Sequence, residues 1–133
     1  MHVHVRIGRE AYAIPVTHVR EVLEIGHVTP LPGSGEHVIG LRNLRGQIVP
    51  VFDVAALIGA GALDEPGKVC VTELNGSVAG LAVDEVTDVA EIPNDGDHVE
   101  SPLVDRSVLA GDRLVGVIDP NELFAELDRR GGR

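Results

Sequence analysis

45-RGQIVPVFDVAALI-58 is matched further along the chain by 111-GDRLVGVIDPNELF-124. Each stretch passes from a turn containing glycine into an apolar strand, then to an aspartate and a short helix. Asp53 aligns with Asp119, and the aligned apolar positions also agree, at Val49/Val115, Val51/Val117 and Leu57/Leu123. A stretch that recurs in this order indicates an internal duplication.

A second pair of segments supports the same duplication. 7-IGREAYAIPVTHVREVLEI-25 corresponds to 74-LNGSVAGLAVDEVTDVAEI-92. The identical pairs are Val16/Val83, Val19/Val86, Val22/Val89, Glu24/Glu91 and Ile25/Ile92. The spacing between partners is nearly the same in both alignments and equals about half of the chain, so the sequence predicts two similar halves.

Most of the chain has the pattern of β-strands. Polar and apolar residues alternate over His2–Ile7, which is typical of a strand with one buried face. Asn75-Gly76 supplies the positive φ angles of a tight hairpin between two such runs. We expect the other strands at 11–16, 38–44, 47–52, 69–74, 78–83, 107–110 and 113–118. With about five short strands in each half, the prediction is two small barrels packed on one another.

Helices are expected to be few and short. Asp119, Pro120 and Glu122 have the spacing of a helix start, with an N-cap, a first-turn proline and a capping box. This helix is expected to run to about Arg129. Asp53 is expected to cap a shorter helix over Val54–Ile58.

Composition limits the classes of function. The formal net charge is −10, and residues 67–133 contribute −8 of it, which disfavours nucleic acid and anionic membrane surfaces as partners. There is no tryptophan, and the two phenylalanines and one tyrosine imply an aliphatic core. The single cysteine, Cys70, excludes an internal disulfide. Without a signal segment or an apolar run of about 18 residues, the chain is expected to be cytoplasmic.

No residue pattern indicates catalysis. The serines lack the context of a nucleophile elbow. His2 and His4 lie on one face of the first strand, but neither cysteine nor carboxylate joins them at a metal-site spacing. We therefore expect neither an enzyme nor a bound metal or cofactor.

In the order of its motifs, the sequence resembles the CheW-like domain of bacterial chemotaxis adaptors. Asn43-Leu44-Arg45-Gly46, followed by Val49-Pro50-Val51 and Asp53, is the most specific part of the resemblance. The remaining matches are Tyr12-Ala13-Ile14-Pro15-Val16, Val19-Arg20-Glu21-Val22, Pro30-Leu31-Pro32, Gly80-Leu81-Ala82-Val83-Asp84 and the run from Gly116 to Asp119.

The resemblance implies a single domain over residues 1–133, made of two intertwined five-stranded SH3-like β-barrels. It implies a non-catalytic scaffold that joins the cytoplasmic tips of chemoreceptors to the regulatory domain of a CheA-type histidine kinase. Self-association and recruitment to membrane-associated receptor arrays would accompany this role, without insertion into the membrane. Two alternatives stay open: an adaptor of a non-flagellar chemosensory pathway, and a sensor of a small ligand.

Candidate partner-binding residues follow from the same motifs. Glu21 and Arg45 are candidates for an ion pair, with two independent surface charges as the alternative. Gly46 would allow the tight turn that presents Arg45. Asn43 could either satisfy the backbone of this turn or contact a partner.

Four valines at matching places in the two halves could belong either to the core or to an interface. They are Val19, Val22, Val86 and Val89. The resemblance implies that the positions of Val19, Val86 and Val89 lie near an apolar groove for the helical receptor tip. Such a groove would hold a helix by burial of apolar surface.

Overall fold

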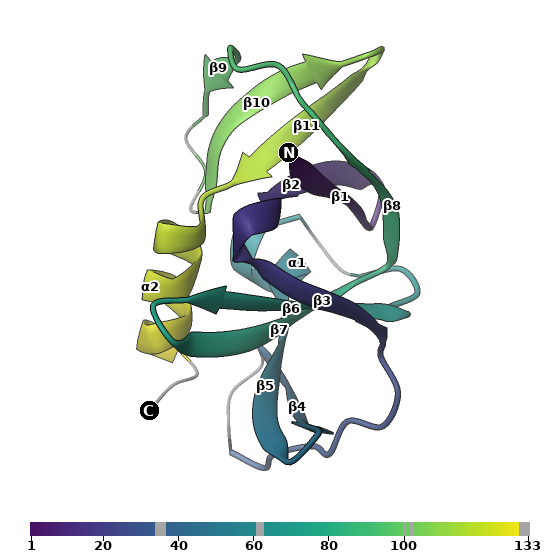
Figure 1. Ribbon diagram of the computed structural model, residues 1–133, viewed down its shortest axis with the longest axis vertical. Coiled ribbons are helices and arrows are strands. Elements are labelled where there is room, and N and C mark those ends of the chain that lie inside the picture. Colours follow the sequence, from purple (N-terminus) through teal and green to yellow (C-terminus); the bar gives the residue numbers. More distant parts are fainter. Residues whose placement is uncertain (34–36, 61–62, 100, 102, 131–133) are drawn as a thin grey trace.

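The computed structural model describes residues 1–33, 37–60, 63–99, 101 and 103–130 (Figure 1). Eleven strands and three short helices follow one another along the described chain. They are β1 (His2–Ile7), β2 (Glu10–Pro15), the 3₁₀ helix η1 (Val16–His18), β3 (Val19–Glu24), β4 (Val38–Leu44), β5 (Gln47–Asp53), α1 (Val54–Ile58), β6 (Lys68–Leu74), β7 (Ser77–Val83), β8 (Glu85–Ala90), β9 (Asp97–His98), β10 (Val104–Ala110), β11 (Arg113–Ile118) and α2 (Pro120–Arg130).

Every predicted strand is present, with small shifts at some ends. The largest shift is in β10, which begins at Val104 where the sequence predicts a start at Ser107. The sequence supplies no bounds for β3 in the first half or for β8 and the two-residue β9 in the second, which therefore has six strands where about five are expected. The Asn75-Gly76 hairpin is confirmed, because Asn75 has φ 51° and Gly76 has φ 88°.

The two halves are intertwined, as the resemblance implies. Sheet A has the strand order β8-β1-β2-β11-β10-β9, and sheet B has the order β3-β6-β7-β5-β4. Each sheet therefore contains one pair of neighbouring strands from one half of the chain, β1–β2 in sheet A and β6–β7 in sheet B, among strands of the other half. Within each sheet the two contributions also meet at a parallel pair, β11 with β2 and β5 with β7. The long axis of the molecule runs from β10–β11 at one end to β4–β5 at the other (Figure 1).

Alternating side chains of these strands build three apolar cores. The largest lies between the sheets and includes Val5, Leu81, Leu57 of α1 and Leu123 of α2. A second core is formed by sheet B, and a third, smaller one by sheet A. β6 is buried on both faces, because Cys70 faces the first core while its neighbours face the second, which explains why this strand reads as a continuous apolar run.

Both helix starts are confirmed. Asp53 accepts hydrogen bonds from the N–H groups of Ala55 and Ala56 at 3.1 and 3.4 Å. Asp119 accepts from the N–H of Asn121 at 3.0 Å, but its own N–H donates to the Leu103 carbonyl at 2.9 Å. This bond to Leu103 takes the place of the reciprocal capping-box bond that the sequence predicts from Glu122.

In each sheet an arginine side chain holds a neighbouring segment by its backbone carbonyl groups. In sheet B, Arg42 of β4 donates to the carbonyl oxygens of Glu24 and Ile25, at the end of β3, at 2.7 and 2.9 Å. In sheet A, Arg106 of β10 donates to the Pro93 and Asp95 carbonyl oxygens, beyond the end of β8, at 3.1 Å each. Arg42 thus bridges the edge strands β3 and β4 of sheet B, whereas Arg106 fixes the segment that leads from β8 to β9, the two edge strands of sheet A.

Candidate partner-binding site

The turn between β4 and β5 is built around a strained arginine. Arg45 has φ 52° and Gly46 has φ 89°, so both central residues of the turn are left-handed, as in a type I′ hairpin. Glycine adopts this conformation freely, whereas arginine rarely does. The Oδ1 atom of Asn43 accepts the N–H of Gly46 at 2.9 Å. Asn43 therefore satisfies the backbone of the turn, which is one of the two roles that the sequence leaves open.

Arg45 pairs with Glu21 of β3 through both of its terminal nitrogens. Nη1 donates to Oε1 at 3.3 Å, and Nη2 donates to Oε2 in the second arm of the pair. The hydrogen bond from Arg45 lowers the pKa of the Glu21 carboxyl, and the arginine charge adds to this effect. The pair joins strands that are 24 positions apart in sequence and lie on opposite edges of sheet B. The predicted ion pair is thus present in the structure.

The pair lies at the surface, beside further groups that can make contacts. The Arg45 side chain is 67% exposed and that of Glu21 is 25% exposed. Arg20 approaches Gln47 at 3.5 Å and Glu73 at 3.6 Å on the same side of sheet B. Large apolar side chains are exposed on the neighbouring strands, with Val22 at 39% and Ile48 at 56%. Strands β3 and β5 thus carry exposed apolar side chains as well as the residues near the charge pair.

The four candidate valines separate into two kinds. Val19 and Val86 are half-buried and pack against the core between the sheets. Val22 and Val89 are exposed, Val89 at 50%. Matching positions in the two halves thus have matching surroundings. Of these four residues, Val22 and Val89 expose the most side chain, while Val19 and Val86 pack against the core beneath β3 and β8.

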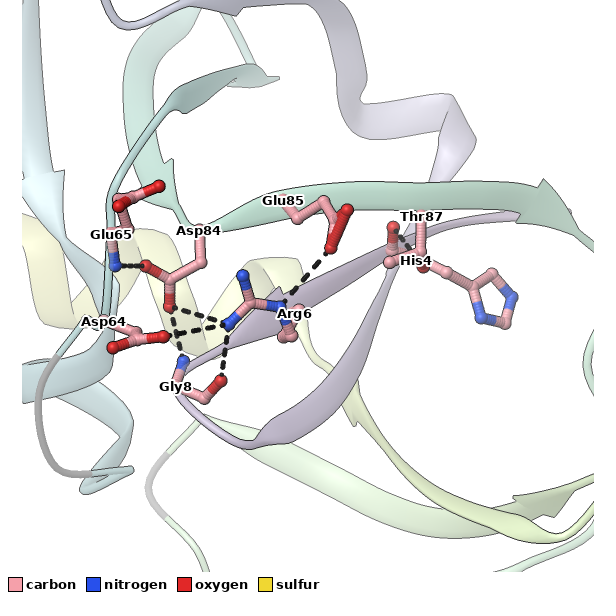
Figure 2. Close-up of polar contacts among 8 residues, drawn as sticks. All are labelled: His4, Arg6, Gly8, Asp64, Glu65, Asp84, Glu85 and Thr87. Atoms are coloured by element: carbon pink, nitrogen blue, oxygen red, sulfur yellow. Dashed lines mark hydrogen bonds and ion pairs between the residues drawn. The ribbon is translucent and has the colours of Figure 1, made fainter.

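A buried charge cluster, to which sequence analysis assigns no role, lies where β7 passes into β8 (Figure 2). The Asp84 side chain is fully buried and accepts the N–H groups of Gly8 and Glu65 at 2.6 and 2.5 Å. Arg6 lies 3.9 Å from the same carboxylate and 3.4 Å from Glu85. Burial opposes ionisation of Asp84, but the two N–H donors and Arg6 outweigh it and lower the pKa of this carboxyl.

The internal repeat gives no indication of this cluster, because the aspartate has no counterpart in the first half. In the alignment that pairs Val16 with Val83, Asp84 aligns with Thr17, which is exposed in η1. The available signal is an aspartate that directly follows the buried run at the end of β7. Asp84 joins the β1–β2 turn, the segment before β6 and the start of β8, so its role is to hold the two sheets in register.

The described residues contain neither of two other kinds of site. No group of three or more histidine, cysteine, aspartate or glutamate side chains suited to a metal ion occurs among them. None of the helices within the described ranges is both long and apolar enough to cross a membrane.

Comparison with known proteins identifies the family. The family model of the CheW-like domain matches residues 2–128, and the chain belongs to this family. A probable chemotaxis protein CheW of Rhizobium etli is 31% identical over 92% of this chain and 86% of the relative. The chemotaxis protein CheW of Thermotoga maritima is 29% identical over 95% of this chain and 88% of the relative.

A solved structure agrees with the fold. The scaffolding protein TtCheW from Thermoanaerobacter tengcongensis superposes with a TM-score of 0.80 at 26% sequence identity, over 90% of this chain and 83% of that protein. The family and the two-sheet architecture inferred from the motifs are therefore confirmed.

Proposed function

We propose that this chain is a chemotaxis coupling scaffold that joins chemoreceptor cytoplasmic tips to a CheA-type histidine kinase. Membership of the CheW-like family supports this role, and the relatives named above are chemotaxis proteins. The observation that carries the proposal is the Glu21–Arg45 pair, held on a strained turn at the surface of sheet B. The scaffold acts without catalysis, at receptor arrays on the cytoplasmic face of the membrane.

The kinase contact is proposed at the β4–β5 turn. A bidentate pair fixes the direction of the Arg45 guanidinium while two-thirds of its side chain stays exposed, so it is oriented for a second acceptor. Val22 of β3 and Ile48 of β5 supply exposed apolar area on the strands that this pair joins. Charges of this kind contribute mainly to the specificity and rate of association, and the apolar neighbours contribute affinity. The partner surface is proposed to be the regulatory domain of the kinase.

The receptor contact is proposed along β3 and β8. Val89 is the most exposed of the four valines, and Val19 and Val86 pack against the core beneath these two strands. A helical receptor tip would bury these apolar side chains. Because each sheet takes strands from both halves of the chain, we propose that the two barrel subdomains act as one domain. Membership of the CheW-like family also leads us to propose self-association within an array.

Titration calorimetry with the regulatory domain of a CheA from the same organism tests the kinase contact. We expect a Kd of about 1 μM or lower, weakened at least tenfold in Arg45→Glu. Arg129→Glu is the matched control, because Arg129 is similarly exposed but lies on α2. Absence of binding by the wild-type chain, or an equal loss in both variants, would overturn the proposal.

Pull-down with a receptor-tip helical hairpin tests the second contact. Val89→Asp is expected to abolish capture while the thermal unfolding midpoint changes little, because this side chain is half exposed. Val86→Asp would also unfold the core against which Val86 packs, and so serves only as a comparison. Full capture by a folded Val89→Asp variant would place the receptor contact elsewhere.

A further inference from the structure

Strand β1 places two histidines on the inner face of sheet A, the face on which this sheet forms its own small core. Val3 and Val5 of β1 are buried in the core between the sheets, so His2 and His4, which alternate with them, point to the opposite face. On that face His4 is the register partner of Ala13, a fully buried member of the sheet A core. Two ionisable rings thus lie beside an apolar core.

The other half of the chain has valines at the corresponding positions. When β1 is aligned with β6 at the spacing of the repeat, His2 and His4 correspond to Val69 and Val71. Both valines belong to the core of sheet B. The two sheets therefore differ at this point in one property, the ability to take up protons.

Each histidine ring has a buried nitrogen without a partner. Nδ1 of His2 and Nε2 of His4 are excluded from solvent and make no hydrogen bond. A neutral imidazole has one N–H group and one bare nitrogen, whereas a protonated ring has two N–H groups and a positive charge. Protonation would therefore create a charged, buried donor without an acceptor, which is more costly than a bare nitrogen.

The charged groups that face His2 also oppose its protonation. Burial lowers the pKa of His2, and the positive charges of the Met1 amine and Arg106 add to this effect. Glu91 acts in the opposite direction, but its carboxylate already pairs with the Met1 amine at 3.3 Å. His2 is thus neutral at pH 7.

The carboxylates near His4 are engaged elsewhere. A cavity of about 220 Å³ is lined by His4 together with Arg6, Glu85 and Arg113. Glu85 accepts from Nε of Arg6 at 3.4 Å. Asp88, the register partner of His4 on β8, accepts the N–H of the next residue at 2.8 Å. Neither carboxylate is bonded to the His4 ring.

Strand β8 depends on β1 for its place in the sheet. It lies at the edge of sheet A and pairs with β1, whereas β2 is held between β1 and β11. The β1–β8 register is irregular between His4 and Val5, which weakens the ladder at this point. The Thr87 hydroxyl donates to the His4 carbonyl at 3.3 Å (Figure 2). A disturbance of His2 and His4 should therefore act first on β8.

We propose that His2 and His4 make sheet A a pH-sensitive switch, in which protonation of these rings releases β8 from β1 while sheet B keeps its pairing. Because the pKa of His2 is lowered on folding, its contribution to stability is complete above the ordinary value of about 6.5 and is lost as the pH falls through the folded pKa. Release of β8 would displace Val89 and weaken receptor capture, a consequence that rests on the proposed function.

Hydrogen–deuterium exchange of the full chain at pH 7.5 and 5.5, corrected for the intrinsic pH dependence of exchange, tests the switch. At pH 5.5 an unhindered imidazole is protonated about ten times more often than it is neutral, so the opened state gains up to about tenfold per histidine. We expect protection of the β8 amides to fall at least about fivefold, and that of β6 and β7 to stay within about twofold. Unchanged protection of β8, or an equal loss in both sheets, would overturn the proposal.

Variants separate these two histidines from the others. His2→Val combined with His4→Val installs the residues that sheet B has, and β8 protection should then vary less than about twofold between the two pH values. His27→Val is the matched control, because His27 is exposed, and it should retain the response of the wild type. Should the double variant fail to fold, the His2 ring of the wild-type chain can be titrated by nuclear magnetic resonance. A midpoint at or above about 6.5, or a full pH response in the double variant, would contradict the switch.

Pull-down of the receptor-tip hairpin at both pH values distinguishes the switch from the receptor contact. We expect capture to fall at pH 5.5 with the wild-type chain and to stay constant with the double variant. Absence of capture at both pH values, together with a pH-dependent β8, would contradict the receptor contact and still support the switch. Equal capture at both pH values with β8 released would overturn the link between the switch and receptor binding.

Discussion

Two arginine–carboxylate clusters in this protein differ in burial and therefore in what they can do. Glu21–Arg45 joins the edges of sheet B at the surface, with the arginine 67% exposed. Asp84–Arg6 joins the two sheets, with the Asp84 side chain fully buried. Exposed pairs contribute little to stability because water and salt screen them, whereas a buried carboxylate left without partners is strongly destabilising. The first cluster is therefore available for binding, and the second holds the fold.

The largest expected effect is that of Asp84→Asn on stability. The amide keeps one acceptor oxygen but turns an NH₂ group toward a backbone N–H of Gly8 or Glu65, so one donor loses its partner. We expect the free energy of unfolding to fall by about 2–4 kcal/mol, measured by urea denaturation. Glu85→Gln is the matched control, because it removes the exposed partner of the same Arg6 and should change stability by less than about 1 kcal/mol. Similar losses in the two variants would contradict the comparison.

The contribution of the Asp84 cluster to stability should also depend on pH. The pKa of Asp84 is lowered in the folded chain relative to the value of about 3.9 of an unfolded one. Its contribution to stability is therefore complete above about pH 4 and is lost as the pH falls through the folded pKa. Urea unfolding at about pH 7, 5, 4 and 3 should show a stability gap between wild type and Asp84→Asn that narrows at the acid end. A gap that widens on acidification would mean that the pKa shift has the opposite sign.

The exposed pair should affect binding more than stability. Arg45→Lys keeps the charge but loses the two-point geometry, because an ammonium group has no planar fork. We expect kinase-domain affinity to fall about three- to tenfold, with an unfolding midpoint close to that of the wild type. The exchange Glu21→Arg with Arg45→Glu restores the ion pair in reverse, and its unfolding midpoint should also stay close to that of the wild type. A loss of stability in Arg45→Lys as large as that in Asp84→Asn would show that both clusters are structural.

The smallest effect is expected at Asn43. Asn43→Ala removes the side-chain bond to the Gly46 N–H in an exposed turn and should lower stability by about 0.5–1 kcal/mol. Asn43→Asp is the control, since it retains the acceptor oxygen. Thermal unfolding of both variants provides the measurement. A loss of affinity without any loss of stability in Asn43→Ala would instead assign Asn43 a direct partner contact.

The sequence by itself determines the local elements and their repetition. Alternation over His2–Ile7, the Asn75-Gly76 hairpin and the capping aspartates Asp53 and Asp119 depend on neighbours close in the chain. These features all appear in the structure. The candidate pair Glu21–Arg45 and the family were also accessible from the sequence, because the motif around Asn43–Gly46 is specific.

The tertiary structure alone decides which strands pair across the two halves. A strand's hydrophobic pattern specifies its buried face but not its partner, so the exchange of strands between the sheets leaves no local signature. For the same reason the sequence does not indicate the structural role of Asp84. Its partners Gly8 and Glu65 are 76 and 19 residues away, and they contribute backbone N–H groups, which every residue type except proline has. The cavity lined by His4 and Arg113 likewise forms only after β1 and β11 have joined the same sheet.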